Sequence, residues 1–327
     1  MITQSINLNE LEISLQQLVG VENKNIALIE AKYDVRIKAN DQHVLISGME
    51  PNVSLALSFV RLAASVVQQY DRLDAQEFDY LFDVVAKGKT ERFIEMMDDV
   101  LTRSFTGKPI RPKTLGQKVF IDAFKQHDLT FAIGPAGTGK TFLAVCYAVE
   151  LLKKGEIQKI ILTRPAVEAG ENLGFLPGDL KEKVDPYLRP LYDALDDMLS
   201  PERVQRYMDK GVIEIAPLAY MRGRTLDDAM IILDEAQNTT KAQMMMFLSR
   251  LGRNSKMIVT GDIDQIDLPR HQQSGLRVAR DYLSDISEIS FVNLSHSDVV
   301  RHPLVIKILK KFAEGERREQ EDSNYRR

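Results

Sequence analysis

Residues 134–141 read Gly134-Pro135-Ala136-Gly137-Thr138-Gly139-Lys140-Thr141. They fit the pattern G-x-x-x-x-G-K-[ST], between a β-like run at 129–133 and a helix-like run at 142–149. Glycines let backbone N–H groups curl around phosphate oxygens, and the positive end of the following helix favours the same anion. Lys140 is expected to reach the β- and γ-phosphates, and the Thr141 hydroxyl to hold Mg²⁺. The alternative is a plain glycine-rich turn, but the flanking runs favour a nucleotide-binding loop.

A second motif has the form of a Walker B strand and reads Met230-Ile-Ile-Leu-Asp234-Glu235-Ala-Gln237. Asp234 is expected to hold Mg²⁺ directly or through water, and Glu235 to polarise the attacking water. Two solvated acids at a strand end are the alternative for this pair. A phosphate loop alone is equally typical of a kinase, so the adjacent glutamate is what favours hydrolysis.

A third strand-like run, 256–260, leads into Gly261-Asp262-Ile-Asp-Gln265. Thr260, Asp262 and Gln265 are expected to sense the γ-phosphate and couple it to movement elsewhere. A strand-end turn is the alternative.

The order of elements predicts an α/β fold from residue 129 onward. Buried-strand-like runs occur at 129–133, 159–163, 212–216, 230–233, 256–260 and 289–294, and helical stretches separate most of them. This alternation predicts a largely parallel sheet with helices on both faces. Nucleotides bind at the carboxyl ends of such strands, where the three motifs lie.

The first 70 residues predict a separate, small α+β module with the order β-α-α-β-β-α. Strands are expected at 2–8, 34–39 and 43–47, helices at 11–19 and 23–32, and a third helix after Pro51. The order resembles a KH RNA-binding module, whose G-x-x-G loop clamps single-stranded nucleic acid. Here that loop reads Gly20-Val21-Glu22-Asn23, and residues 1–100 carry a net charge of −7. We therefore expect the module alone to bind RNA weakly or not at all.

Two more helices are expected at 77–86 and 90–100. The segment 103–117 has two prolines and several basic residues, which predicts a linker at a domain boundary. The predicted domains are 1–100, 101–312 and a charged, disordered tail at 313–327.

Composition sets broader limits on the class of protein. With 44% hydrophobic and 28% charged residues, the chain is typical of a soluble globular protein. No signal peptide or membrane-spanning stretch is evident, and the single cysteine, Cys146, suits a reducing cytoplasm. The five histidines show no metal-ligand spacing. The net charge of −4 does not by itself indicate nucleic-acid binding.

The motifs together resemble the PhoH-like ATPase family over residues 100–312. Besides the phosphate loop, the matching stretches are LTRPAVEAGENLGFLPGDL, PYLRPLYDAL, PLAYMRGRTL, IILDEAQNTT, VTGDIDQIDLP and SDVVRHPLV. The resemblance extends to the RecA-like ATPase core of superfamily-one helicases. It implies ATP as the nucleotide, an adenine-reading role for Gln117, and nucleic-acid contact beginning at Thr163-Arg164-Pro165. It also implies a γ-phosphate arginine at Arg301, with Arg222 and Arg224 as rivals.

About 190 residues follow the phosphate loop, room for one such core and not for two. The resemblance therefore implies a ring-like homo-oligomer, expected to be a hexamer, in which a neighbouring subunit supplies Arg301. It also implies Mg²⁺-dependent ATP hydrolysis in RNA metabolism, with unwinding or remodelling of single-stranded or structured RNA beside an endoribonuclease partner. The alternative is a nucleotide-gated adaptor that controls a protein partner without moving nucleic acid.

Overall fold

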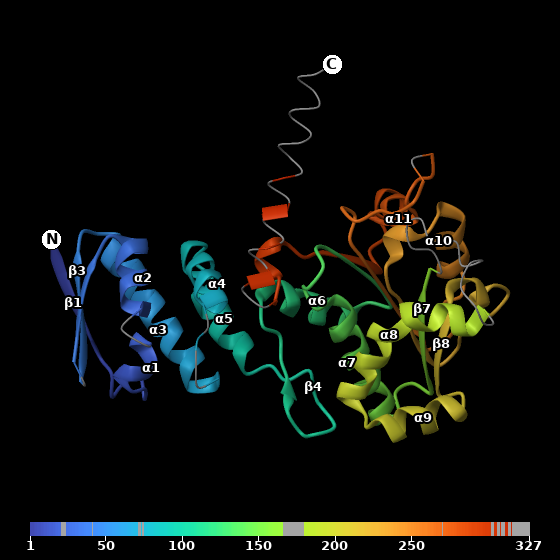
Figure 1. Cartoon of the computed structure of the whole chain (residues 1–327), viewed down its shortest axis with the longest axis horizontal. Coiled ribbons are helices and arrows are strands. Elements are labelled where there is room, and N and C mark those ends of the chain that lie inside the picture. Colours follow the sequence, from blue (N-terminus) through green and yellow to red (C-terminus); the bar gives the residue numbers. More distant parts are fainter. Residues whose placement is uncertain are drawn as a thin grey trace, which may run out of the picture. The chain divides into compact units, whose positions relative to one another are not determined.

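The structure, a computed structural model, describes residues 1–327 except 21–23, 41, 71, 72, 74, 166–179, 270, 302, 303, 306, 307, 309, 310, 313, 314 and 316–327. The contacts divide the chain into two compact units (Figure 1). One comprises Met1–Asp98 with Arg301–Arg327, and the other comprises Asp99–Val300. The tail predicted at 313–327 lies outside the described residues, apart from Gly315. Among the described helices, none has the length and apolar character needed to cross a membrane.

The larger unit is built on a parallel sheet, as predicted. Its strands are β6 (Leu129–Ile133), β7 (Lys159–Arg164), β8 (Ile213–Pro217), β9 (Ala229–Leu233), β10 (Lys256–Gly261) and β11 (Ile289–Asn293). They lie in the order β11-β6-β10-β9-β7-β8, and every neighbouring pair is parallel. Strands β6 and β9 are buried along their whole length, which explains why β9 reads as an unbroken apolar run and β6 as a run interrupted only by Thr130.

Helices cover both faces of this sheet because successive strand side chains point to opposite sides. Ile160 and Leu162 pack into one core with α6 (Leu115–Gln126), α7 (Lys140–Lys154), α8 (Leu180–Met198) and α9 (Pro201–Asp209). Ile161, between them, packs into the other core with α10 (Lys241–Leu248) and α11 (Gly275–Leu283). The two cores fix the strand order and so decide which strand ends become neighbours.

The segment 103–117, predicted as a linker at the start of the domain 101–312, forms regular structure within the larger unit. Strands β4 (Thr102–Arg103) and β5 (Pro109–Ile110) pair antiparallel, and the buried Thr102 hydroxyl donates to Glu150 Oε2 at 2.5 Å. Thr114 then caps α6 by accepting from the Gln117 N–H at 3.1 Å. The prediction was wrong because proline and basic residues also suit a short, exposed hairpin.

The smaller unit has the predicted order β-α-α-β-β-α. Its strands β1 (Ile2–Asn7), β2 (Arg36–Ala39) and β3 (His43–Gly48) form an antiparallel sheet in the order β1-β3-β2. The helices are α1 (Leu15–Val19), α2 (Lys24–Tyr33), α3 (Asn52–Tyr70), α4 (Ala75–Ala86) and α5 (Thr90–Met97). The rings of Tyr33, Phe59, Phe78 and Phe82 pack together in its core.

Helix α1 begins four residues later than predicted. The Ser14 and Gln17 side chains form a capping box that sets its start, and the residues before Ser14 form turns. Of the loop predicted to resemble G-x-x-G, residues 21–23 lie outside the described residues.

Candidate nucleotide-binding site

The phosphate loop joins β6 to α7 and takes its shape from glycine. Gly137 and Gly139 have φ angles of 86° and 81°, a left-handed backbone that other residues seldom adopt. At Gly134 a Cβ atom would lie 2.4 Å from the Leu294 carbonyl oxygen, so the loop leaves no room for a side chain there. The Lys140 ammonium is buried and donates to the carbonyls of Gly134 at 2.6 Å and Pro135 at 2.8 Å. The cation is thus held within the loop that would receive the phosphates.

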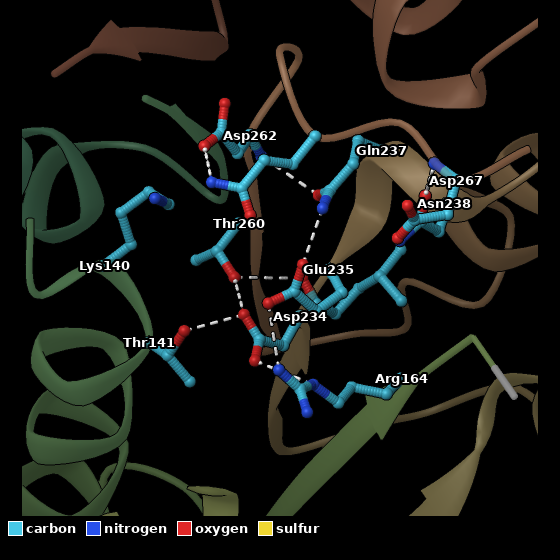
Figure 2. Close-up of polar contacts among 12 residues, drawn as sticks. Lys140, Thr141, Arg164, Asp234, Glu235, Gln237, Asn238, Thr260, Asp262 and Asp267 are labelled. Carbon is cyan, nitrogen blue, oxygen red and sulfur yellow. Dashed lines mark hydrogen bonds and ion pairs between the residues drawn. The ribbon is translucent and has the colours of Figure 1, made fainter. Parts of the chain in front are cut away.

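The Asp234 carboxylate is the centre of the site (Figure 2). Its Oδ1 accepts from the Thr141 hydroxyl at 2.7 Å and from the Thr260 hydroxyl at 2.6 Å. Its Oδ2 accepts from Arg164 Nε at 3.0 Å. These partners come from α7 and from β10 and β7, the two strands that flank β9. Only 5% of the Asp234 side chain is exposed, and it receives donors from three elements.

Glu235 follows in a left-handed backbone conformation, with φ at 53°. Its Oε1 accepts from Arg164 Nη2 at 3.0 Å, and its Oε2 from Gln237 Nε2 at 2.6 Å. Burial, and next the charge of Asp234, raise the pKa of this carboxyl above its usual range, although Gln237, Arg164 and Lys140 oppose the shift. The side chain remains 42% exposed. Glu235 is therefore a basic carboxylate that water can still reach.

Gln237 links Glu235 to the predicted γ-phosphate sensors. Its Oε1 accepts from the Asp262 N–H at 3.0 Å, and Gln265 Nε2 donates to Asp262 Oδ2 at 2.9 Å. Beside them, the Asp267 N–H donates a hydrogen bond to Asn238 Oδ1 at 2.8 Å. Of the three predicted sensors, Thr260 thus touches Asp234 directly, and the other two connect to Glu235 through Gln237.

Gln117, expected to read adenine, is buried against the phosphate loop. Its Nε2 donates to the Thr138 carbonyl at 3.0 Å, and its Oε1 accepts from the Lys113 N–H at 2.7 Å. These two bonds tie the side chain to the loop and use one of its two amide N–H donors and one of its two oxygen lone pairs. Gln117 therefore supports the loop in the present arrangement.

The three candidate arginines have different surroundings. Arg224 forms a bidentate ion pair with Glu214, at 2.6 and 2.7 Å, whereas Arg222 is exposed. The unit that contains the site ends at Val300, whose N–H donates to the Gly137 carbonyl at 2.8 Å. Arg301 is the next residue and is counted with the other unit.

The family model for PhoH-like proteins matches residues 109–313. A PhoH-like protein of Bacillus subtilis is 52% identical over 295 residues, which cover 90% of this chain and 92% of that protein. This chain belongs to the PhoH-like family. Protein PhoH of Escherichia coli is 44% identical over 207 residues, 63% of this chain and 58% of that protein. Among solved structures, the UvsW helicase from bacteriophage T4 is 11% identical over 64% of this chain and 67% of that one. Its TM-score of 0.35 is too low to bear on activity.

Two residues of this PhoH-like site were not predicted as site residues from the sequence. Arg164 was predicted only as part of a nucleic-acid contact, and the structure shows that it also forms ion pairs with Asp234 and Glu235. Gln237 was noted only as part of the Walker B motif. The sequence does show that both residues lie at strand ends, because Arg164 ends one apolar strand and Asp234 follows another. The sequence does not show, however, that those two strands are neighbours.

The site suits a magnesium–nucleotide complex. Among the described residues, no group of three or more His, Cys, Asp or Glu side chains could hold a metal by itself. Mg²⁺ in nucleotide sites needs only one or two protein oxygens, since phosphates and water supply the rest. The Thr141 hydroxyl donates its proton to Asp234, which leaves its oxygen lone pairs for a cation. Thr141 and Asp234 therefore fit as the protein ligands.

Proposed function

We propose that this PhoH-like chain hydrolyses ATP with Mg²⁺. The observation that carries the proposal is the 2.7 Å hydrogen bond between Thr141, at the end of the phosphate loop, and Asp234, at the end of β9. This bond brings the phosphate loop and the Walker B motif into direct contact, and Glu235 is the next residue after Asp234. A bound Mg²⁺ would supply positive charge to the β- and γ-phosphates.

The remaining roles follow from the positions of the side chains. Lys140 would exchange its loop carbonyls for phosphate oxygens and stabilise the charge that develops on the γ-phosphate. Glu235 would accept a proton from the attacking water, for which its raised pKa suits it. Gln237 holds the carboxylate from one side and Arg164 from the other.

We further propose that hydrolysis is coupled to RNA in a homo-oligomer with an endoribonuclease partner. This part is supported only by the family resemblance of the motifs. The test is ATP turnover by the full chain with and without Mg²⁺ and with and without single-stranded RNA. Turnover that requires Mg²⁺ and rises with RNA is the expected result. Mg²⁺-dependent turnover unchanged by RNA would favour the nucleotide-gated adaptor, and no turnover under any condition would refute the ATPase.

The proposed oligomer makes Arg301 a residue that completes a neighbour's site. Preparations of Arg301→Ala and of Lys140→Ala chains should each be nearly inactive. Mixed oligomers should recover part of the activity, because a chain with Lys140 can meet a neighbour with Arg301. Verified mixed oligomers without recovery would place the role of Arg301 within one chain, where Val300 already contacts the phosphate loop.

A further inference from the structure

One guanidinium group bridges both acids of the site (Figure 2). Arg164 Nε lies 3.0 Å from Asp234 Oδ2, and Arg164 Nη2 lies 3.0 Å from Glu235 Oε1. Its side chain is only 12% exposed. Arg164 comes from the last position of β7, and the acids follow β9, its neighbour in the sheet.

Charge balance explains why a cation is needed at this place. Asp234 and Glu235 are adjacent carboxylates, and Asp234 is almost fully buried. Burying such a charge without a partner is costly, and two like charges side by side increase the cost. The planar fork of arginine donates from two nitrogens to two acceptors, which the ammonium of lysine does not do in the same geometry.

The same charge balance changes when magnesium–nucleotide arrives. A divalent cation held by Thr141 and Asp234 would neutralise the same acids that Arg164 contacts. Two cations sharing one buried carboxylate repel each other strongly where the dielectric is low. Arg164 and the metal are therefore competitors for Asp234.

We propose that Arg164 is the resident counter-ion of Asp234 and Glu235 in the nucleotide-free protein, and that it leaves Asp234 when magnesium–nucleotide binds. The inference rests on the proposed function, because it assumes that Mg²⁺ and nucleotide bind at this site. Because Arg164 is the last residue of β7, the position of its side chain at the end of this strand would then depend on whether the metal is bound. Arg164 acts here on the metal site and needs no direct contact with the nucleotide.

The first experiment uses Mg²⁺ alone, with thermal unfolding of the full chain in chelator and then in excess Mg²⁺. Removing Arg164 takes away the cation that contacts both acids, so Mg²⁺ should raise the Tm of Arg164→Gln by ~3 °C or more. The wild type and Arg224→Gln should shift by less than ~1 °C. Arg224→Gln is the matched control because it breaks another arginine–carboxylate pair, with Glu214, in the same unit. An equal Mg²⁺ response in Arg164→Gln and the two references would overturn the proposal.

The second experiment measures binding of a fluorescent, non-hydrolysable ATP analogue as Mg²⁺ is titrated. The Mg²⁺ concentration for half-maximal binding should fall roughly 5- to 150-fold in Arg164→Gln, the usual range for coupled sites. If Arg164→Gln does not fold, Arg164→Lys should still show a smaller fall, because lysine loses one of the two contacts. An unchanged Mg²⁺ requirement in the folded variant refutes the counter-ion role and leaves the ATPase proposal intact. Failure of the wild type to bind the analogue at any Mg²⁺ concentration refutes the proposed function itself.

Discussion

At the scale of single residues, Glu235 stands beside the proposed metal ligand without being one. Glu235→Gln leaves Thr141 and Asp234 in place, so binding of magnesium–nucleotide should be kept. Loss of the base should slow hydrolysis by roughly 10²- to 10⁴-fold. The measurement is single-turnover hydrolysis together with equilibrium binding. Glu150→Gln, which alters a carboxylate on α7 that binds Thr102 and Lys154, is the control and should hydrolyse normally. Wild-type turnover by Glu235→Gln would exclude it as the base.

The raised pKa of Glu235 also predicts how the stability of the protein depends on pH. Burial and Asp234 disfavour the ionised carboxyl in the folded state, so Glu235 lowers stability as pH rises through its raised pKa. In chelator and without nucleotide, Glu235→Gln should therefore have a higher Tm than the wild type at pH 8. The difference in Tm should close as pH falls toward the ordinary glutamate pKa of about 4.3. The Glu235 carboxyl of the folded wild type is then protonated and carries no charge, like the glutamine that replaces it. A lower Tm for Glu235→Gln at pH 8 would contradict this.

Spacing within single motifs was enough to select Lys140, Thr141, Asp234 and Glu235 as candidates. Each motif is local, because strand, turn and helix follow one another in the chain. The positions of Arg164 and Gln237 depend on which strands are neighbours. The order β10-β9-β7 is set by packing on both faces of the sheet and has no local signal.

At the scale of elements, Gly134 is where the phosphate loop leaves β6 and passes β11. A methyl group there would meet the Leu294 carbonyl oxygen at 2.4 Å, a backbone atom that cannot turn away. Gly134→Ala should therefore destabilise the protein by about 1–3 kcal/mol and weaken nucleotide binding. Gly155→Ala, at the end of α7, is the control. It has a φ of 73° but open space around it, so it should lower Tm modestly and leave binding unchanged. Equal binding by both variants would contradict the argument, which denaturant unfolding and nucleotide titration can test.

Element positions were predictable where burial is complete and not where it is partial. The apolar runs at 129–133 and 230–233 appear as β6 and β9 within one residue of their predicted bounds. The start of α1 was misplaced because a capping box at Ser14 outweighs the apolar spacing from residue 11. The hairpin of β4 and β5 was missed because two-residue strands have too few side chains to show alternation.

At the scale of the whole molecule, Cys146 provides a report on unfolding of the larger unit. It is the only cysteine in the sequence, lies fully buried in α7, and burial raises the pKa of its thiol far above the usual range. The thiolate is the reactive form, so alkylation at pH 8 has to wait until the unit opens. The rate of alkylation thus measures opening of the unit Asp99–Val300 and does not report on the smaller unit.

Magnesium–nucleotide should therefore protect Cys146 from alkylation in mild urea. A ligand that binds only the folded unit at about one hundred times its Kd stabilises it by about 2.7 kcal/mol, so labelling should slow by roughly 100-fold. Lys140→Ala should lose this protection, because the ammonium that would face the phosphates is gone. Lys154→Ala, an exposed lysine at the far end of α7, should keep it. Rapid labelling of the native chain without urea would show that the fold does not protect Cys146. Equal protection in Lys140→Ala would show that nucleotide does not bind through this loop.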